Sequence, residues 1–238
     1  MEKEYKSIVL FFIAIAIIVF IGFFPTYFIH FPKFEGFLSL HHFHAIVMIS
    51  WLLMLIIQPI LISKRKYQWH RLIGQISYFL VPIIIISMLL VYKRAFINSL
   101  DTNGINNIES LCLLFLPLTD VLPFTVFYLL AIKNKKETPN HFRYMISTAI
   151  VIVGAGFVRI LTVWFDMDFI SGLYVNGGVL TLVFVGLILY DLKYNKLSNN
   201  KSFVIAFFVF VIPNFLLLFV PNTAWWQSLT NEIAKAFI

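Results

Sequence analysis

Charged residues are scarce in this chain, and their scarcity excludes an ordinary soluble domain. Only 12% of the 238 residues are Asp, Glu, Lys or Arg, whereas 61% are hydrophobic. Soluble domains carry about 25% charged and roughly 45–50% apolar residues. Apolar stretches of about 20 residues, which are long enough to cross a bilayer, recur along the sequence. We therefore predict a polytopic integral membrane protein in contact with a lipid bilayer.

Cysteine and long polar segments are also nearly absent. The single cysteine, Cys112, excludes an intramolecular disulfide and any CxxC redox motif. The longest polar gap, KRAFINSLDTNGINNIES at residues 93–110, is too short to fold by itself. We therefore expect one integral domain over residues 1–238.

The apolar runs show no strict alternation, as a β-barrel would require. Backbone groups in lipid must be hydrogen-bonded within their own segment, which favours helices. The predicted fold is an all-α, seven-transmembrane-helix bundle. The expected spans are about 7–29, 42–63, 71–92, 110–132, 142–164, 172–192 and 203–221.

The basic residues predict the orientation, because they are enriched in cytoplasmic loops. With seven spans, the N-terminal side holds Lys3, Lys6, Lys64, Arg65, Lys66, Arg71, Lys133, Lys135, Lys136, Arg143, Lys193, Lys196 and Lys201. The other side holds only Lys33, Lys93, Arg94 and Lys235. This asymmetry predicts an N-in, C-out chain, and we expect it in a bacterial inner membrane. It also explains the net charge of +7 without nucleic-acid binding.

Polar residues at helical spacing predict an inward face on the second span. His44, Trp51 and Gln58 are seven residues apart, so each is displaced by only about 20° from the one before. His41 lies one turn earlier on the same stripe. The opposite face is aliphatic and suits lipid.

The later spans carry further polar groups, which are costly in a membrane and by default mark a functional site or a buried partner. His141 and Arg159 align on the fifth span, and Asn176 lies near the outer end of the sixth. Asp120 lies between two prolines that should distort the fourth span. Arg159 and Asp120 are expected within reach of each other, as a structural ion pair or as a counter-charge for an anionic group or a proton path.

All six histidines lie at predicted membrane boundaries, in two layers, and five begin helices. The helix dipole disfavours a charged imidazole there, and a neutral imidazole is what a metal or haem iron requires. His70 and His141 are expected at one depth, where they could oppose each other across a haem. His44 or His41, with His30, could form an outer counterpart. The alternative is that these histidines are simply polar side chains at the lipid–water boundary.

A resemblance follows from HHFHAIVMISWLLMLIIQ, HRLIGQISYF and TPNHFRYMISTAIVIVGAGFVRI, which cover about residues 41–160. These segments resemble a group of uncharacterised bacterial multi-pass membrane families, and their histidines are similar to those of two-haem transmembrane b-type cytochromes. The resemblance implies His44, His70 and His141 as ligands of haem b, with His41 as the alternate outer ligand. Arg159, Trp51 and Gln58 would line the cofactor site between the second and fifth spans. The implied function is electron transfer with a quinone or another redox protein as partner.

Other functions of multi-span proteins can be compared with the sequence, and some of them stay open. A retinal protein is excluded, because the seventh span has no lysine for a Schiff base. Zinc hydrolases related to the adiponectin receptors use HxxxH in the last span, and no histidine follows His141. A zinc or copper site could still be built from outer histidines. Two alternatives remain. The chain could be a transporter or small-molecule binding protein that uses the inward stripe, or an assembly subunit without a site or cofactor. Enzymatic activity is therefore left open.

Overall fold

The computed structural model describes residues 2–194 and 201–237, and in that part of the chain it contains helices and no strand. The predicted all-α class is therefore confirmed. The chain forms two compact units, Met1–Val91 and Tyr92–Ile238. The single domain over 1–238 stays a prediction, and Lys196, one of the predicted cytoplasmic lysines, lies outside the described residues.

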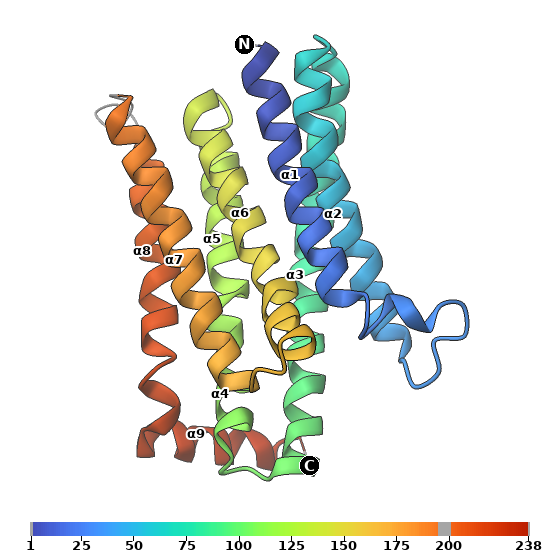
Figure 1. Cartoon of the computed structure of the whole chain (residues 1–238), viewed down its shortest axis with the longest axis vertical. Coiled ribbons are helices and arrows are strands. Elements are labelled where there is room, and N and C mark those ends of the chain that lie inside the picture. The colour runs from blue at the N-terminus through green and yellow to red at the C-terminus, as the bar shows by residue number, and fades with distance from the viewer. Residues whose placement is uncertain (1, 195–200, 238) are drawn as a thin grey trace. The chain divides into compact units, whose positions relative to one another are not determined.

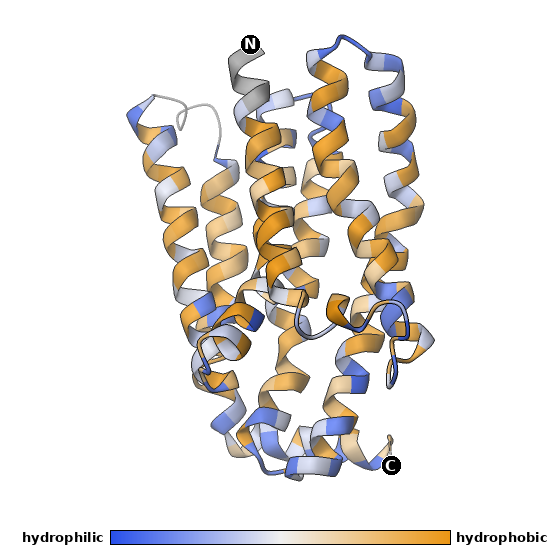
Figure 2. Cartoon of the chain, turned by 45° about the vertical axis from the view of Figure 1, so that its right-hand side comes forward, coloured by the Kyte–Doolittle hydropathy of each residue, from blue (hydrophilic) through white to orange (hydrophobic). Residues whose placement is uncertain are grey.

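Six helical segments of the described chain are long and apolar enough to cross a membrane. They are Ser39–Ser63, Tyr67–Asn103, Ile108–Lys133, Thr138–Trp164, Phe169–Lys193 and Ser202–Asn222. Ser7–Phe23, in the first predicted span, is a shorter apolar helix. Hydrophobic residues cover the helices along most of their length, and hydrophilic residues gather at their ends and in the loops (Figure 2). The chain is thus an integral membrane protein with several spans, while the count of seven and the N-in orientation stay predictions.

The first unit contains α1 (Glu2–Phe23), η1 (Phe28–His30), α2 (Ser39–Ser63) and the beginning of α3 (Tyr67–Asn103). α1 and α2 lie side by side (Figure 1). The loop between them packs aromatic rings around His42, whose Nδ1 lies 2.7 Å from the Tyr27 hydroxyl. His42 therefore points into this loop.

α3 is longer than predicted, because the polar gap after residue 92 is largely helical. Its 37 residues span about 55 Å at 1.5 Å per residue, well beyond a hydrocarbon core of about 30 Å. Lys93 and Arg94, expected in a loop, lie within this helix. Phe96 is buried in the core of the second unit, and the Ser99 hydroxyl lies 2.8 Å from that of Ser110. These contacts hold the extension of α3 against α4 and explain why a polar sequence is helical here.

The second unit is organised around α6 (Thr138–Arg159), the most buried of the membrane-length helices. It packs against α5 (Val121–Lys133), α7 (Phe169–Lys193) and α8 (Ser202–Leu216). A π-helical turn, η2 (Ile160–Trp164), follows α6 directly. The fully buried residues of α6 include small ones such as Ser147, Thr148 and Ala149, which let neighbouring helices approach closely.

The fourth predicted span is interrupted where its prolines predict. α4 (Ile108–Thr119) ends before Asp120 and α5 begins at Val121. Pro117 lies inside α4 and Pro123 in the first turn of α5. Each proline removes a backbone donor, so the helix is broken at Asp120.

A short helix at the C-terminal end was not predicted. After η3 (Val220–Asn222), α9 (Ala224–Lys235) runs across the ends of α4 and α8 at a large angle to α7 (Figure 1). The indole Nε1 of Trp226 donates to the carbonyl of Leu111 at 3.0 Å, whereas Trp225 is exposed. The Trp226 indole anchors α9 to α4. Because α9 is polar in composition, hydropathy alone did not predict this helix.

Adjacent glycines on α7 provide a test of helix packing in the second unit. A Cβ at Gly177 would lie 3.2 Å from Asn214 Oδ1 of α8, whereas one at Gly178 would meet nothing within 4 Å. The Asn214 amide is held in place by its donation to Phe210 O at 2.8 Å. We therefore expect Gly177→Ala to be less stable than Gly178→Ala by about 1 kcal/mol, the low end of overpacking costs. Reversible unfolding in mixed micelles would measure this difference, and equal stabilities would contradict the packing.

Candidate functional site

The imidazole of His44 is fixed in one tautomer by a neighbouring serine. His44 Nδ1 lies 3.0 Å from the Oγ of Ser87, on α3. Ser87 donates its only hydroxyl hydrogen to the carbonyl of Ile84 at 2.7 Å, so its Oγ must accept from the ring. His44 Nδ1 therefore carries a proton, and in the neutral ring Nε2 carries the lone pair.

His141 has the same tautomer for a different reason. Its Nδ1 lies 2.8 Å from the carbonyl oxygen of Ala131, on α5. A carbonyl can only accept, so Nδ1 is the donor and Nε2 again carries the lone pair of the neutral ring. The ring belongs to the start of α6.

The polar stripe of α2 faces α3, as its seven-residue spacing predicts. His44 contacts Ser87 near one end of the stripe, and Gln58 Nε2 donates to the carbonyl of His70 at 3.2 Å near the other. Trp51 lies between them and is 0% exposed. On the opposite side of α2, Ile46 and Leu53 are exposed. His44, Trp51 and Gln58 therefore form one polar wall of the first unit.

The other predicted ligands differ in what surrounds them. His41 Nδ1 accepts from the backbone N–H of Leu38 at 3.0 Å, so its lone pair serves the start of α2. His30 is exposed, and its ring lies tilted against that of Phe37, with the centroids 5.3 Å apart. These contacts favour His44 over His41 as the outer ligand. His70 and His141 belong to different units, so their pairing stays a prediction.

Asp120 is hydrogen-bonded by a residue that the sequence did not single out. The Tyr92 hydroxyl, on α3, donates to Asp120 Oδ2, and the Thr119 hydroxyl lies 3.4 Å from Oδ1. Arg159 donates to the carbonyl of Ala155 at 3.1 Å, and its guanidinium interacts electrostatically with the Tyr92 phenol. Tyr92 thus links the two charged residues that were expected to meet directly. It was overlooked because it falls at the predicted end of the third span.

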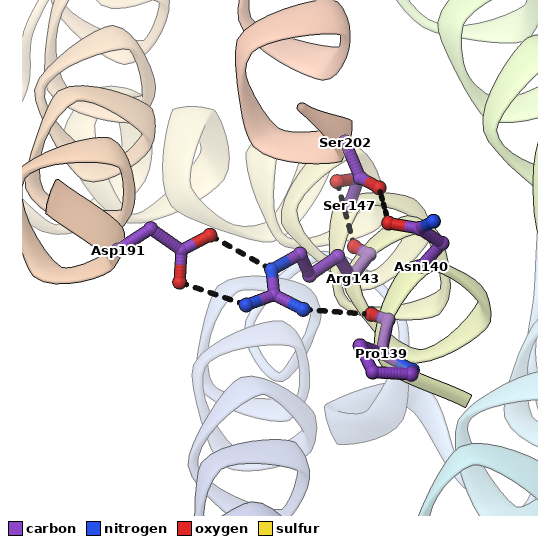
Figure 3. Close-up of polar contacts among 6 residues, drawn as sticks. All are labelled: Pro139, Asn140, Arg143, Ser147, Asp191 and Ser202. Carbon is purple, nitrogen blue, oxygen red and sulfur yellow. Dashed lines mark hydrogen bonds and ion pairs between the residues drawn. The ribbon is translucent and has the colours of Figure 1, made fainter. Parts of the chain in front are cut away.

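A buried ion pair joins α6 to α7 at the other end of the second unit (Figure 3). Arg143 Nε and one terminal nitrogen donate to the two oxygens of Asp191 at 2.8 and 2.9 Å, and the other nitrogen donates to Pro139 O at 3.0 Å. Arg143 is 7% exposed and Asp191 1% exposed. Arg143 was counted among the loop residues that set orientation, and the structure instead places it in the protein interior. The available signal was Asp191, a lone acid at the end of an apolar span that needed a partner.

Comparisons with known proteins do not place the chain in a family. No family model, curated protein or solved structure matches it. Within the described residues, no group of three or more His, Cys, Asp or Glu is arranged to hold a metal ion. The chemistry of the individual side chains is therefore the guide to function.

Asn176 is buried on α7, as expected for a polar residue that turns away from lipid. A Cβ added at Gly154 of α6 would lie 3.1 Å from Nδ2 of Asn176, so the missing side chain at Gly154 makes room for the Asn176 amide. Oδ1 of Asn176 has no hydrogen-bond partner among the described residues. Asn176 is therefore a polar position in the α6–α7 interface and not part of the Asp120 cluster.

Proposed function

We propose that this chain is a membrane redox protein that binds b-type haem through neutral imidazoles, with His44, His70 and His141 as axial ligands. The observation that supports it most directly is the tautomer shared by His44 and His141. In both rings Nδ1–H is a donor to an oxygen, which leaves the lone pair on Nε2. Iron and other metals bind neutral imidazole through such a lone pair.

The hydrogen bonds at Nδ1 also fit the proposal chemically. A metal-ligating histidine almost always donates its other N–H to a carbonyl, carboxylate or water, which fixes the ring and raises the basicity of the ligating nitrogen. Ala131 O fills this role for His141, and the Ser87 hydroxyl fills it for His44. Two residues 97 positions apart in the sequence (141 minus 44) thus have the same arrangement.

Haem b would supply one-electron chemistry, with its potential set by the axial ligands, their hydrogen bonds and burial. The chain would hold the imidazoles, and the buried Trp51 indole, two turns along α2 from His44, would help to exclude water. A quinone or another redox protein would be the electron partner, in a bacterial inner membrane. The stretches that span the bilayer give such a partner access from lipid.

An absorption spectrum of the purified protein tests the proposal. The full chain is expressed with a haem precursor, purified in detergent and measured oxidised and dithionite-reduced. We expect a Soret band and a sharpened reduced α band, as for low-spin bis-imidazole haem. Expression without the precursor provides the control. A monodisperse helical protein that stays colourless with excess haem would contradict the proposal.

A further inference from the structure

The break at Asp120 lies in the middle of a membrane-length helix. α4 and α5 together cover Ile108–Lys133, 26 residues, so Asp120 is about 18 Å from the start of α4 by helix rise. The interruption is a single residue: Asp120 keeps an α-region backbone, donates its N–H to Leu116 O at 3.0 Å and accepts from Phe124 N at 3.1 Å. Broken helices of this kind form the ion and substrate sites of secondary transporters.

The prolines also change the polar groups around the break. Pro117 and Pro123 have no N–H, so the carbonyls of Leu113 and Thr119 lose their usual helical donors. The Thr119 hydroxyl donates to Leu116 O at 3.0 Å. The Tyr92 hydroxyl is therefore the stronger of the two hydroxyl contacts to the Asp120 carboxyl.

The charged and titratable groups of the neighbouring helices fall into three sets. Tyr92 of α3 and Arg159 of α6 interact with each other and belong to the Asp120 cluster. Cys112 of α4 and Tyr174 of α7 interact two turns away from Asp120. On α9, Glu232 and Lys235 pair with each other at the surface.

The chain around Arg159 is also irregular. The guanidinium is at the last residue of α6, and the π-helical turn Ile160–Trp164 follows it. π-helical turns are uncommon and occur frequently at functional sites. Irregular backbone therefore occurs on two helices at the same polar cluster.

We infer that Asp120 is a proton-exchanging carboxyl in the middle of the membrane, with the Tyr92 hydroxyl as its hydrogen-bond partner and the Arg159 guanidinium acting on the pair through Tyr92. In one state Asp120 is a neutral acid. In the other it has released one proton to water and is a carboxylate that accepts from Tyr92. No electron is transferred, and no haem is needed, so this site goes beyond the proposed function.

The two states are physically accessible because opposite influences act on the carboxyl. An isolated carboxylate is costly in hydrocarbon, which favours the neutral acid. The hydroxyl donor Tyr92 favours the carboxylate.

Infrared difference spectroscopy of the full chain in lipid tests this inference. Spectra are recorded between mildly acidic and mildly alkaline buffer, in H₂O and in D₂O. We expect a C=O stretching band of a protonated carboxylic acid that appears on acidification and moves to lower frequency in D₂O. Asp120→Asn should remove this band, whereas Asp101→Asn, at an exposed position of α3, should leave it.

Tyr92→Phe keeps the ring and removes the hydroxyl, so it provides a second variant if Asp120→Asn does not fold. It should shift the frequency of the band and its titration midpoint. An unchanged band in Tyr92→Phe, a band retained in Asp120→Asn, or no pH-dependent band in the parent would each overturn the inference. All of these results are independent of haem absorbance, so failure of the redox proposal would be seen separately.

Discussion

Arg143→Ala is expected to lower the free energy of unfolding by about 3 kcal/mol, the lower end of the cost of breaking a buried ion pair. The substitution removes two hydrogen bonds to Asp191 and leaves this carboxyl buried without its charged partner. It also removes the contact of the guanidinium with the Phe203 ring, whose centroid is 5.5 Å away. Reversible unfolding in mixed micelles, followed by circular dichroism, would measure the change.

Two variants separate the ion pair from a general effect of charge. Lys136→Ala removes an exposed positive charge from the adjacent loop and should change stability little. The double variant Arg143→Met with Asp191→Leu replaces the pair by apolar groups and should recover most of the loss. Equal effects of Arg143→Ala and Lys136→Ala would show that the pair does not hold α6 to α7.

The ion pair belongs to a larger arrangement at the start of α6. Asn140 accepts from the Ser202 hydroxyl of α8 at 2.5 Å, His141 donates to the backbone of α5, and Arg143 binds Asp191 of α7. Residues within four positions of one another thus bind three different helices. This explains why α6 is the central helix, and it makes the orientation of the His141 ring a property of the whole helix packing.

Properties set by local sequence could be predicted. The membrane class follows from composition, the face of His44 and Gln58 from helical spacing, and the break at Asp120 from its flanking prolines. In each case the physical cause lies within a few turns of one segment. The structure agrees with all three, because neighbouring helices did not override these local preferences.

Properties that depend on distant partners could not be predicted. Arg143 and Asp191 are 48 residues apart, and a basic residue at a helix start also fits a role in membrane orientation. The extension of α3 is helical because Phe96 and Ser99 pack against α4, which hydropathy does not report. The donors and acceptors of His44 and His141 likewise depend on Ser87 and Ala131, which no motif connects to them.

The second large effect is expected at the proposed iron ligands. His44→Ala and His141→Ala should each remove haem absorbance or convert low-spin bands to high-spin bands, because an axial ligand is lost. Ser87→Ala keeps His44 but removes the acceptor of its Nδ1–H, so the haem should remain with affinity weakened by about tenfold. Haem titration of the purified proteins and redox potentiometry would measure both effects.

His42→Ala provides the matched control, because it removes a histidine at the same end of α2 whose ring is engaged by the Tyr27 hydroxyl, and it should leave the spectrum unchanged. The Ser87 variant distinguishes ligation from folding: a merely structural serine would alter stability without moving the haem potential. If His44→Ala and His42→Ala had identical spectra and affinities, His44 would not be a ligand. Loss of absorbance in His141→Ala alone would then restrict haem binding to His141 and His70, the two proposed ligands that remain.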